Sequence, residues 1–310
     1  QMSNDAPTVL RDQDGAVAVL TVSNPRRRNA FAPEVRTALV GHMRDIADDD
    51  AVRAILITGA GGTFSAGGDL STMQDMNAFQ GRERIRAGRG MVEALWSSEK
   101  PIVAAVDGFA FGAGLSLALM ADWIVAADDA KFCASFGKVG LMGDMALFWT
   151  LPQRVKAGKA RRILMLADVV DAAVALDIGL VEEVAPTGEA FARGMAKARA
   201  FAEAAPLPNR LTREALGQFP APLDDMLSYE AHGQGLLFGT QDAQDGFAAR
   251  EVLRRILADE VREREYFEVE LDGTNDIEAR RVRAREGGGR EGTDWAMTRD
   301  QLGRLVDELG

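Results

Sequence analysis

Cysteine, histidine and long apolar runs are scarce in this 310-residue sequence, and each scarcity excludes a class of protein. The single cysteine, Cys133, rules out a disulfide framework and a cysteine-based zinc site, and two histidines are too few for a histidine-rich metal site. No apolar run reaches the roughly 18 residues of a membrane span, and the polar, acidic start has no apolar signal core. We therefore expect a cytoplasmic protein that needs no metal and has no membrane partner.

Basic residues are also fewer than acidic ones. The chain has 36 lysines and arginines against 47 acidic residues, which gives a net charge of −11. Such a balance argues against nucleic acid as a partner, although it allows a local basic patch for a phosphorylated ligand. The 47% hydrophobic content is enough for one large core, with or without an appendage.

Short β-branched runs alternate with helical patterns along the first two thirds of the chain. The pattern predicts strands at 16–22, 53–58, 101–106, 123–127 and 180–184, and helices at 33–50, 147–166 and 172–179. This alternation is typical of an α/β fold.

Composition changes near residue 250, where arginine, glutamate and aspartate become frequent. We expect a core over 1–200, a helical region over 201–250 and an atypical charged extension over 251–310. Within that extension the sequence favours a charged helix at 251–268, a linker or disorder at 272–295 and a short helix at 298–309. None of these segments carries a chemical motif.

Two glycine-rich turns follow predicted strands. The first, 59–70, fails as a dinucleotide fingerprint because Phe64 stands where a third glycine is required. It is either a tight turn capped by Asp69, or a turn whose small residues let the backbone approach a ligand. Those small residues are Ser65, Ala66, Gly67 and Gly68.

The second turn, 107–119, favours the ligand-binding interpretation. Gly112, Ala113 and Gly114 open an apolar helix whose first N–H groups have no partner within the helix. Two such turns that converge would form an oxyanion hole made of main-chain N–H groups.

The motifs NPRRRNAF (24–31), TFSAGGDL (63–70), AAVDGFAFGAGLSLALMAD (104–122) and FGKVGLMGDMALFWTLPQRV (136–155) occur in one order. In order and spacing, over 16–249, the sequence resembles the crotonase, or enoyl-CoA hydratase/isomerase, superfamily. The resemblance implies a crotonase-like α/β spiral of ββα units with C-terminal helices, assembled as a homotrimer or hexamer. It also implies an acyl-CoA substrate, with coenzyme A present only as part of that substrate.

The same resemblance suggests roles for individual residues. It places the N–H groups of Ala66 and Ala113 as oxyanion donors, and the cluster Arg26, Arg27 and Arg28 near the phosphates of coenzyme A. A solvated turn is the other interpretation of these three arginines. The rest of the expected substrate-binding set comes from the two turns and the segment after them: Ser65, Gly67, Gly68, Asp69, Gly112, Gly114, Ser116 and Phe136.

Ser116 and Phe136 stand where the resemblance places the two glutamates of enoyl-CoA hydratases, which makes standard hydration doubtful. The remaining carboxylate is Asp144, similar in placement to the single aspartate of dienoyl-CoA and epoxyphenylacetyl-CoA isomerases. We therefore expect an isomerase in which Asp144 shuttles a proton, inside apolar surroundings that raise its pKa. The alternative role for Asp144 is to cap the helix that starts near Met145.

Three other functions remain open. Ser116, Asp144 and His232 follow the chain order of an α/β-hydrolase triad, although the segment around Ser116 lacks the second small residue of the nucleophile elbow. A crotonase-type hydrolase of C–C or thioester bonds is a second alternative. A non-catalytic subunit that binds CoA esters is the third. Phe136 suggests either a bulky acyl group or a pocket that is already filled.

Overall fold

The computed structural model describes residues 6–218, 221–248, 265–271, 277–284 and 290–297. By its internal contacts the chain divides into two compact units, residues 1–226 and residues 227–310. In the described part of the chain, no helix is both long enough and apolar enough to span a bilayer.

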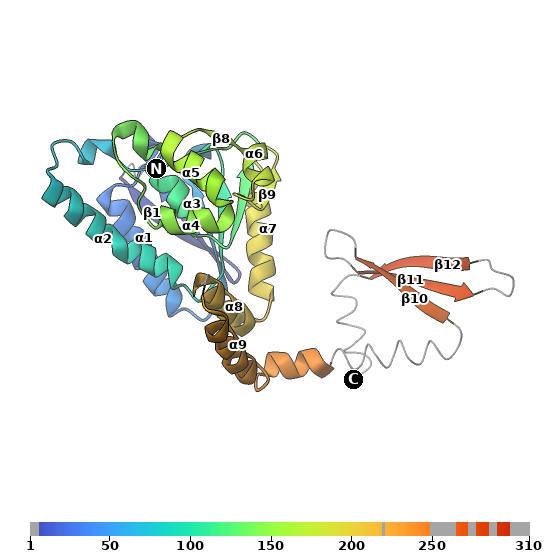
Figure 1. Cartoon of the computed structure of the whole chain (residues 1–310). Coiled ribbons are helices and arrows are strands. Elements are labelled where there is room, and N and C mark those ends of the chain that lie inside the picture. Colours follow the sequence, from blue (N-terminus) through green and yellow to red (C-terminus); the bar gives the residue numbers. More distant parts are fainter. Residues whose placement is uncertain (1–5, 219–220, 249–264, 272–276, 285–289, 298–310) are drawn as a thin grey trace. The chain divides into compact units, whose positions relative to one another are not determined.

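A six-stranded sheet forms the centre of the first unit, counted over the described residues (Figure 1). The order is β1 (Thr8–Asp14), β2 (Val17–Ser23), β3 (Ala54–Gly59), β4 (Ile102–Val106), β6 (Trp123–Ala127) and β9 (Glu183–Ala185). β1 pairs with β2 in antiparallel fashion, and all later neighbours are parallel. The predicted strands 16–22, 53–58, 101–106 and 123–127 are thus confirmed, whereas the last predicted strand begins three residues later than expected.

Both faces of this sheet are covered, which explains why its strands are almost continuously apolar. Ala18, Leu20 and Val22 of β2 belong to the core under α1 (Pro33–Ala47), which packs against α2 (Ala78–Trp96) (Figure 1). Val17 and Val19 point to the other face and pack under α7 (Ala190–Glu203). The alternation of side chains along each strand therefore supplies two separate cores.

A small second sheet holds the end of the glycine turn that follows β4. β5 (Phe109–Phe111) runs parallel to β7 (Lys131–Cys133), which pairs with β8 (Val170–Asp171) in antiparallel fashion. α3 (Ala113–Ala118) starts directly after β5, and all of its residues are buried. The second sheet thus fixes the point at which α3 begins.

The predicted helix over 147–166 is two helices, α4 (Leu147–Arg154) and α5 (Ala157–Leu166). Val155 and Lys156 between them have extended ψ angles of 154° and 145°, which breaks the helical path. α6 (Ala172–Asp177) confirms the next predicted helix, and α8 (Pro206–Gln218) and α9 (Leu223–Leu237) follow α7.

In the second unit, three strands form an antiparallel sheet in the order β10 (Glu265–Leu271), β11 (Ile277–Ala284) and β12 (Arg290–Met297). The predicted linker over 272–295 is therefore wrong where β11 and β12 occur, because these segments pair through their backbones. The predicted helix over 251–268 is wrong at its end, which belongs to β10. Its earlier part, and the predicted helix at 298–309, lie outside the described residues.

Candidate active site

The two glycine turns meet through their backbones. The N–H of Ser65 donates to the carbonyl of Phe109 at 2.7 Å, and the N–H of Phe111 donates back to the carbonyl of Ser65 at 3.0 Å. A Cβ at Gly114 would lie 2.6 Å from the Ser65 carbonyl oxygen, and one at Gly67, where φ is +102°, would lie 2.7 Å from the Phe111 oxygen. Only glycine allows this close approach, so the turns converge because of these residues.

The structure corrects one expected oxyanion donor. The N–H of Ala66 donates to the carbonyl of Arg28 at 2.9 Å, so it is already satisfied. Gly68 and Ala113 instead line one shared cavity. In the described chain, neither of their N–H groups donates to another backbone carbonyl, and Ala113 is the first residue of α3, where the helix provides no acceptor. Gly68 therefore replaces Ala66 as the candidate partner of Ala113.

The shared cavity has a volume of about 240 Å³. Residues of the segment before α1, of α1, of α2 and of the loop before α4 line it together with the two turns. Its apolar wall consists of Phe31, Met73, Ile85, Met91, Val92 and Met145. Among the described residues that line the cavity, Asp144 is the one acid.

The carboxylate of Asp144 does not cap a helix. The residue before α4 is Ala146, no side chain caps that helix, and Asp144 Oδ1 is buried without a hydrogen-bond partner in the described chain. Burial raises the pKa of Asp144, while the nearby cations Arg84 and Arg36 lower it. Asp144 as a whole is half-buried, and an acid with one enclosed, unpartnered oxygen and a raised pKa is suited to exchange a proton.

The backbone that presents Asp144 adopts an uncommon conformation. Met145 and Ala146 both have positive φ, of 50° and 61°, a region that non-glycine residues seldom occupy. Two consecutive residues of this kind cost free energy and persist only where the surroundings fix them. They turn the chain between Asp144 and the start of α4.

Ser116 contacts this loop through its hydroxyl group. Its side chain is fully buried, and its hydroxyl lies 3.1 Å from the Asp144 carbonyl oxygen and 3.4 Å from that of Gly112. A hydroxyl held in this way is not a free nucleophile. The hydrolase-triad alternative is therefore not supported, and His232, which is exposed, has its Nδ1 at 2.6 Å from the Ser228 carbonyl.

Several expected binding residues have structural roles. Ser65 is buried and donates to the Asn29 carbonyl at 2.8 Å, and Asp69 accepts two hydrogen bonds from Ser71, at 3.0 and 2.6 Å. The hydrogen bond from the Ser71 hydroxyl is the main reason that the pKa of Asp69 is lowered. Asp69 therefore caps the short helix Leu70–Thr72, as the first of the two interpretations of this turn predicted.

Gly112 and Phe136 lie beside the cavity. Gly112, with φ of +51° and ψ of −120°, donates its N–H to the Cys133 carbonyl at 2.8 Å, which directs the chain into α3. Phe136 packs on the core, with its ring tip 3.8 Å from where a Gly112 side chain would begin. Phe136 is not among the residues that line the cavity.

The three arginines at 26–28 are exposed at and just after the short helix Pro25–Arg27. A guanidinium nitrogen of Arg27 lies 3.8 Å from the Asp69 carboxylate. The backbone of Arg28 contributes directly to the site region, because its carbonyl holds Ala66. Contact of these side chains with coenzyme A remains a prediction.

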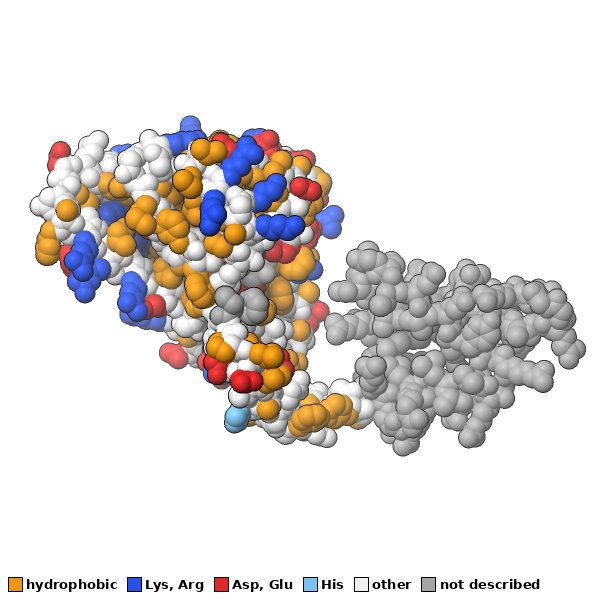
Figure 2. All heavy atoms as spheres, in the orientation of Figure 1, with side chains coloured by type: hydrophobic (Ala, Val, Ile, Leu, Met, Phe, Trp, Pro, Cys, Tyr) orange, Lys and Arg blue, Asp and Glu red, His pale blue; other side chains and the backbone are white. Residues whose placement is uncertain are grey.

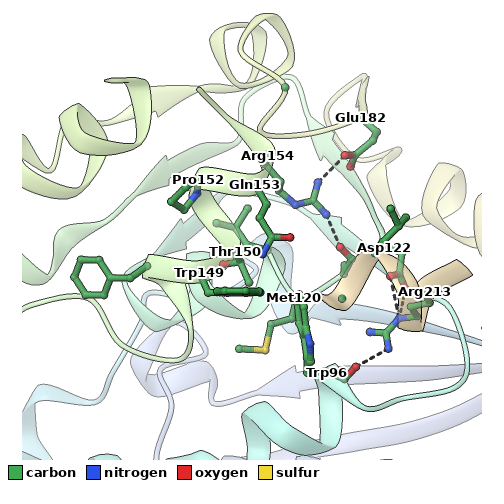
Figure 3. A pocket seen from close by; sticks show the side chains of 16 residues that line it. Trp96, Met120, Asp122, Trp149, Thr150, Pro152, Gln153, Arg154, Glu182 and Arg213 are labelled. Carbon is green, nitrogen blue, oxygen red and sulfur yellow. Dashed lines mark hydrogen bonds and ion pairs between the residues drawn. The ribbon is translucent and has the colours of Figure 1, made fainter. Parts of the chain in front are cut away.

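A larger hollow of about 830 Å³ lies elsewhere on the first unit, lined by Trp96, Trp149 and residues of α4 and α8 (Figure 3). Its charged groups neutralise one another: Arg154 pairs with Glu182 at 2.6 Å, and Arg213 pairs with Asp122 at 2.9 Å. Of the two glycine turns, only Leu119 at the end of the second lines it, and Gly68, Ala113 and Asp144 do not. The smaller cavity is therefore the candidate active site.

Two residues of that cavity, Arg36 and Arg84, were not predicted from the sequence. Each lies on a helix that looks amphipathic and solvated, and their meeting depends on how α1 packs against α2. In the described chain there is no cluster of three or more metal-ligating side chains.

A half-buried acid beside two converging main-chain turns, on a largely parallel sheet, is typical of sites that stabilise a negative oxygen such as that of an enolate. The sequence profile of the enoyl-CoA hydratase/isomerase family matches residues 12–251, so the chain belongs to this family. It has the crotonase-type α/β fold with C-terminal helices, and the family acts on CoA esters.

Individual relatives differ in their stated reactions. The chain is 32% identical over 243 residues to the crotonyl-CoA hydratase of Syntrophomonas wolfei, covering 78% of this chain and 94% of the relative. It is 31% identical over 255 residues to the 1,2-epoxyphenylacetyl-CoA isomerase of Escherichia coli, with the same two shares. The crystal structure of an enoyl-CoA hydratase from Polaromonas matches with a TM-score of 0.75 at 30% identity, covering 78% of this chain and 96% of that one.

Proposed function

We propose that the protein is an acyl-CoA isomerase that moves a carbon–carbon double bond by proton transfer through Asp144. The observation that carries the proposal is that Asp144 is the one acid among the described residues lining the cavity that Gly68 and Ala113 share. By the resemblance of the motifs, Ser116 and Phe136 stand at the positions where hydratases of this family carry two glutamates. Several relatives are named hydratases, but this chain lacks that pair of carboxylates.

In the proposed reaction, the thioester carbonyl accepts hydrogen bonds from the N–H groups of Gly68 and Ala113. The Asp144 carboxylate removes a proton from C2 when the double bond lies at C3, or from C4 when it lies at C2, and the electron pair moves through the conjugated system into the carbonyl to give a dienolate. The two N–H groups stabilise the negative oxygen. The protonated acid then returns the proton at the other carbon, which shifts the double bond and restores the carboxylate.

The test compares the protein with its Asp144→Asn variant on 3-hexenoyl-CoA in D₂O, followed by NMR. The intact protein should interconvert the 2- and 3-enoyl esters and incorporate deuterium, without hydration or release of free acid. Asp144→Asn should lower the rate by about 10²- to 10⁴-fold, the usual contribution of a general acid–base. Asp45→Asn, an exposed acid of α1 that does not line the cavity, is the matched control.

Formation of a 3-hydroxyacyl ester by the intact protein would show that it is a hydratase and would contradict the proposal. Release of coenzyme A or of a shortened acyl chain would replace it with hydrolysis. Binding of CoA esters with neither turnover nor exchange would indicate a non-catalytic subunit.

A further inference from the structure

The cavity that holds Asp144 also holds positive charge. Arg36 of α1 and Arg84 and Arg89 of α2 line it. α2 carries arginines at 82, 84, 86 and 89, and Figure 2 shows Lys and Arg side chains gathered along this helix. Arg36 and Arg84 are half-buried and Arg89 is exposed. Covering the two half-buried guanidinium groups with a plain hydrocarbon chain, without an anion beside them, would cost free energy.

The three arginines of the cavity differ in the hydrogen-bond and ion-pair partners of their side chains. Arg89 pairs with Glu93 at 2.5 Å, so its charge is neutralised. Arg84 donates to the hydroxyl of Thr72 at 3.0 Å, which holds its position without cancelling its charge. Within the described chain, neither Arg36 nor Arg84 has a carboxylate within ion-pair distance.

The charges in the cavity therefore do not balance. Among the residues that line the cavity, two cations, Arg36 and Arg84, face one acid, Asp144. Glu34 and Asp69, which also interact with these arginines, are not among the lining residues. Burial lowers the pKa of Arg36 and the neighbouring Arg84 cation lowers it further, whereas Asp144 and Glu34 raise it. An anion bound between the guanidinium groups of Arg36 and Arg84 would compensate their like charges. Its hydrogen bonds would also replace the hydration that these groups lose on burial.

We propose that the substrate's acyl group ends in a carboxylate, which Arg36 and Arg84 bind, so that the substrate is a mono-CoA thioester of an unsaturated dicarboxylic acid. This inference rests on the proposed function, since it places the thioester at Gly68 and Ala113. The volume of about 240 Å³ is below the roughly 300–1,000 Å³ of most ligand pockets, which favours a short acyl chain. Arginine is well suited to this role because its planar guanidinium binds a carboxylate through two hydrogen bonds.

Binding of saturated esters tests the inference without any catalytic step. Isothermal titration would compare glutaryl- and adipyl-CoA with pentanoyl- and hexanoyl-CoA, which have the same chain lengths but end in methyl groups. The protein should bind one of the carboxylate esters at least about tenfold more tightly than its methyl partner, as expected for a charge-assisted hydrogen bond. Arg36→Met and Arg84→Met should each remove most of that preference while binding the methyl ester as well or better.

Arg86→Met is the matched control, because Arg86 lies on the same helix, is exposed, pairs with Glu83 at 3.3 Å and does not line the cavity. Arg36→Lys and Arg84→Lys serve as conservative variants, and thermal unfolding shows whether each variant folds. A variant that unfolds cooperatively but has lost the carboxylate preference separates ligand binding from a merely structural role of the arginine.

Equal binding of the carboxylate and methyl esters by the intact protein would overturn the inference, as would a preference that survives both methionine variants. Neither result would affect the proposed isomerisation, which is measured independently as deuterium exchange with 3-hexenoyl-CoA. Loss of exchange in Asp144→Asn with the carboxylate preference intact would in turn separate catalysis from substrate selection.

Discussion

Two opposing effects act on the pKa of Asp144, and together they determine how the activity depends on pH. Burial raises its pKa above the ordinary 3.8, and Arg84 and Arg36 limit that rise. Only the ionised form can act as a base, so kcat/KM should fall as the pH drops through this raised pKa, at a higher pH than an ordinary aspartate would give.

Arg84→Met removes one of the cations that lower the pKa of Asp144. The acid limb of the kcat/KM profile should therefore move to higher pH, measured with 3-hexenoyl-CoA so that carboxylate binding plays no part. Arg86→Met should leave the limb in place. A limb that moves to lower pH in Arg84→Met, or does not move at all, would show that this cation does not act on the catalytic acid.

At the scale of single residues, the sequence indicated the acid but not its partners. Asp144 could be identified because it is the carboxylate of a recognisable motif. The choice between Ala66 and Gly68 could not be made, because it depends on a hydrogen bond from Ala66 to Arg28, far away in the sequence. Arg36 and Arg84 were missed for a related reason: each becomes a pocket residue only when two helices pack together.

At the scale of elements, the close approach of the two glycine turns is what brings the Gly68 and Ala113 N–H groups to one cavity. In Gly114→Ala the new Cβ would lie 2.6 Å from the Ser65 carbonyl oxygen and 2.8 Å from its Cβ, both of which must move. We expect a loss of about 1–3 kcal/mol in the free energy of unfolding from this overpacking. We also expect kcat to fall by about 10²- to 10³-fold, as when one oxyanion donor is displaced.

Gly41→Ala in α1 is the control for this substitution, since nothing lies within 4 Å of its added Cβ. This change should stabilise the protein by about 0.5–1 kcal/mol through the better helix propensity of alanine, without altering kcat. Urea denaturation and the deuterium-exchange rate measure the two effects. If Gly114→Ala keeps full activity, the spacing of the turns does not control the oxyanion site.

The elements themselves were predictable where packing follows a simple period. Strands β2, β3, β4 and β6 are almost continuously apolar and bounded by turns, so the sequence identified them. The break between α4 and α5 was not predicted, because the apolar spacing continues through Val155 and the extended backbone there shows only in the structure.

At the scale of the whole molecule, the second unit shows where sequence patterns stop being informative. β11 reads IEARRVRA, which lacks the apolar alternation from which a half-buried strand is predicted. Its antiparallel pairing with β10 and β12 rests on backbone hydrogen bonds that any such sequence can form. Composition alone therefore suggested a linker.

Every described residue that lines the candidate active site lies between Phe31 and Ala146, and the family match ends at residue 251. A chain ending at Glu251 contains the whole first unit and the whole family match, so it should keep both its isomerase activity and the thermal transition of the first unit. Calorimetry and the exchange assay on the shortened chain test this, with the full chain as reference. If the shortened chain loses deuterium exchange while its thermal transition is unchanged, residues 252–310 supply a group to the reaction. The candidate active site described above would then be incomplete.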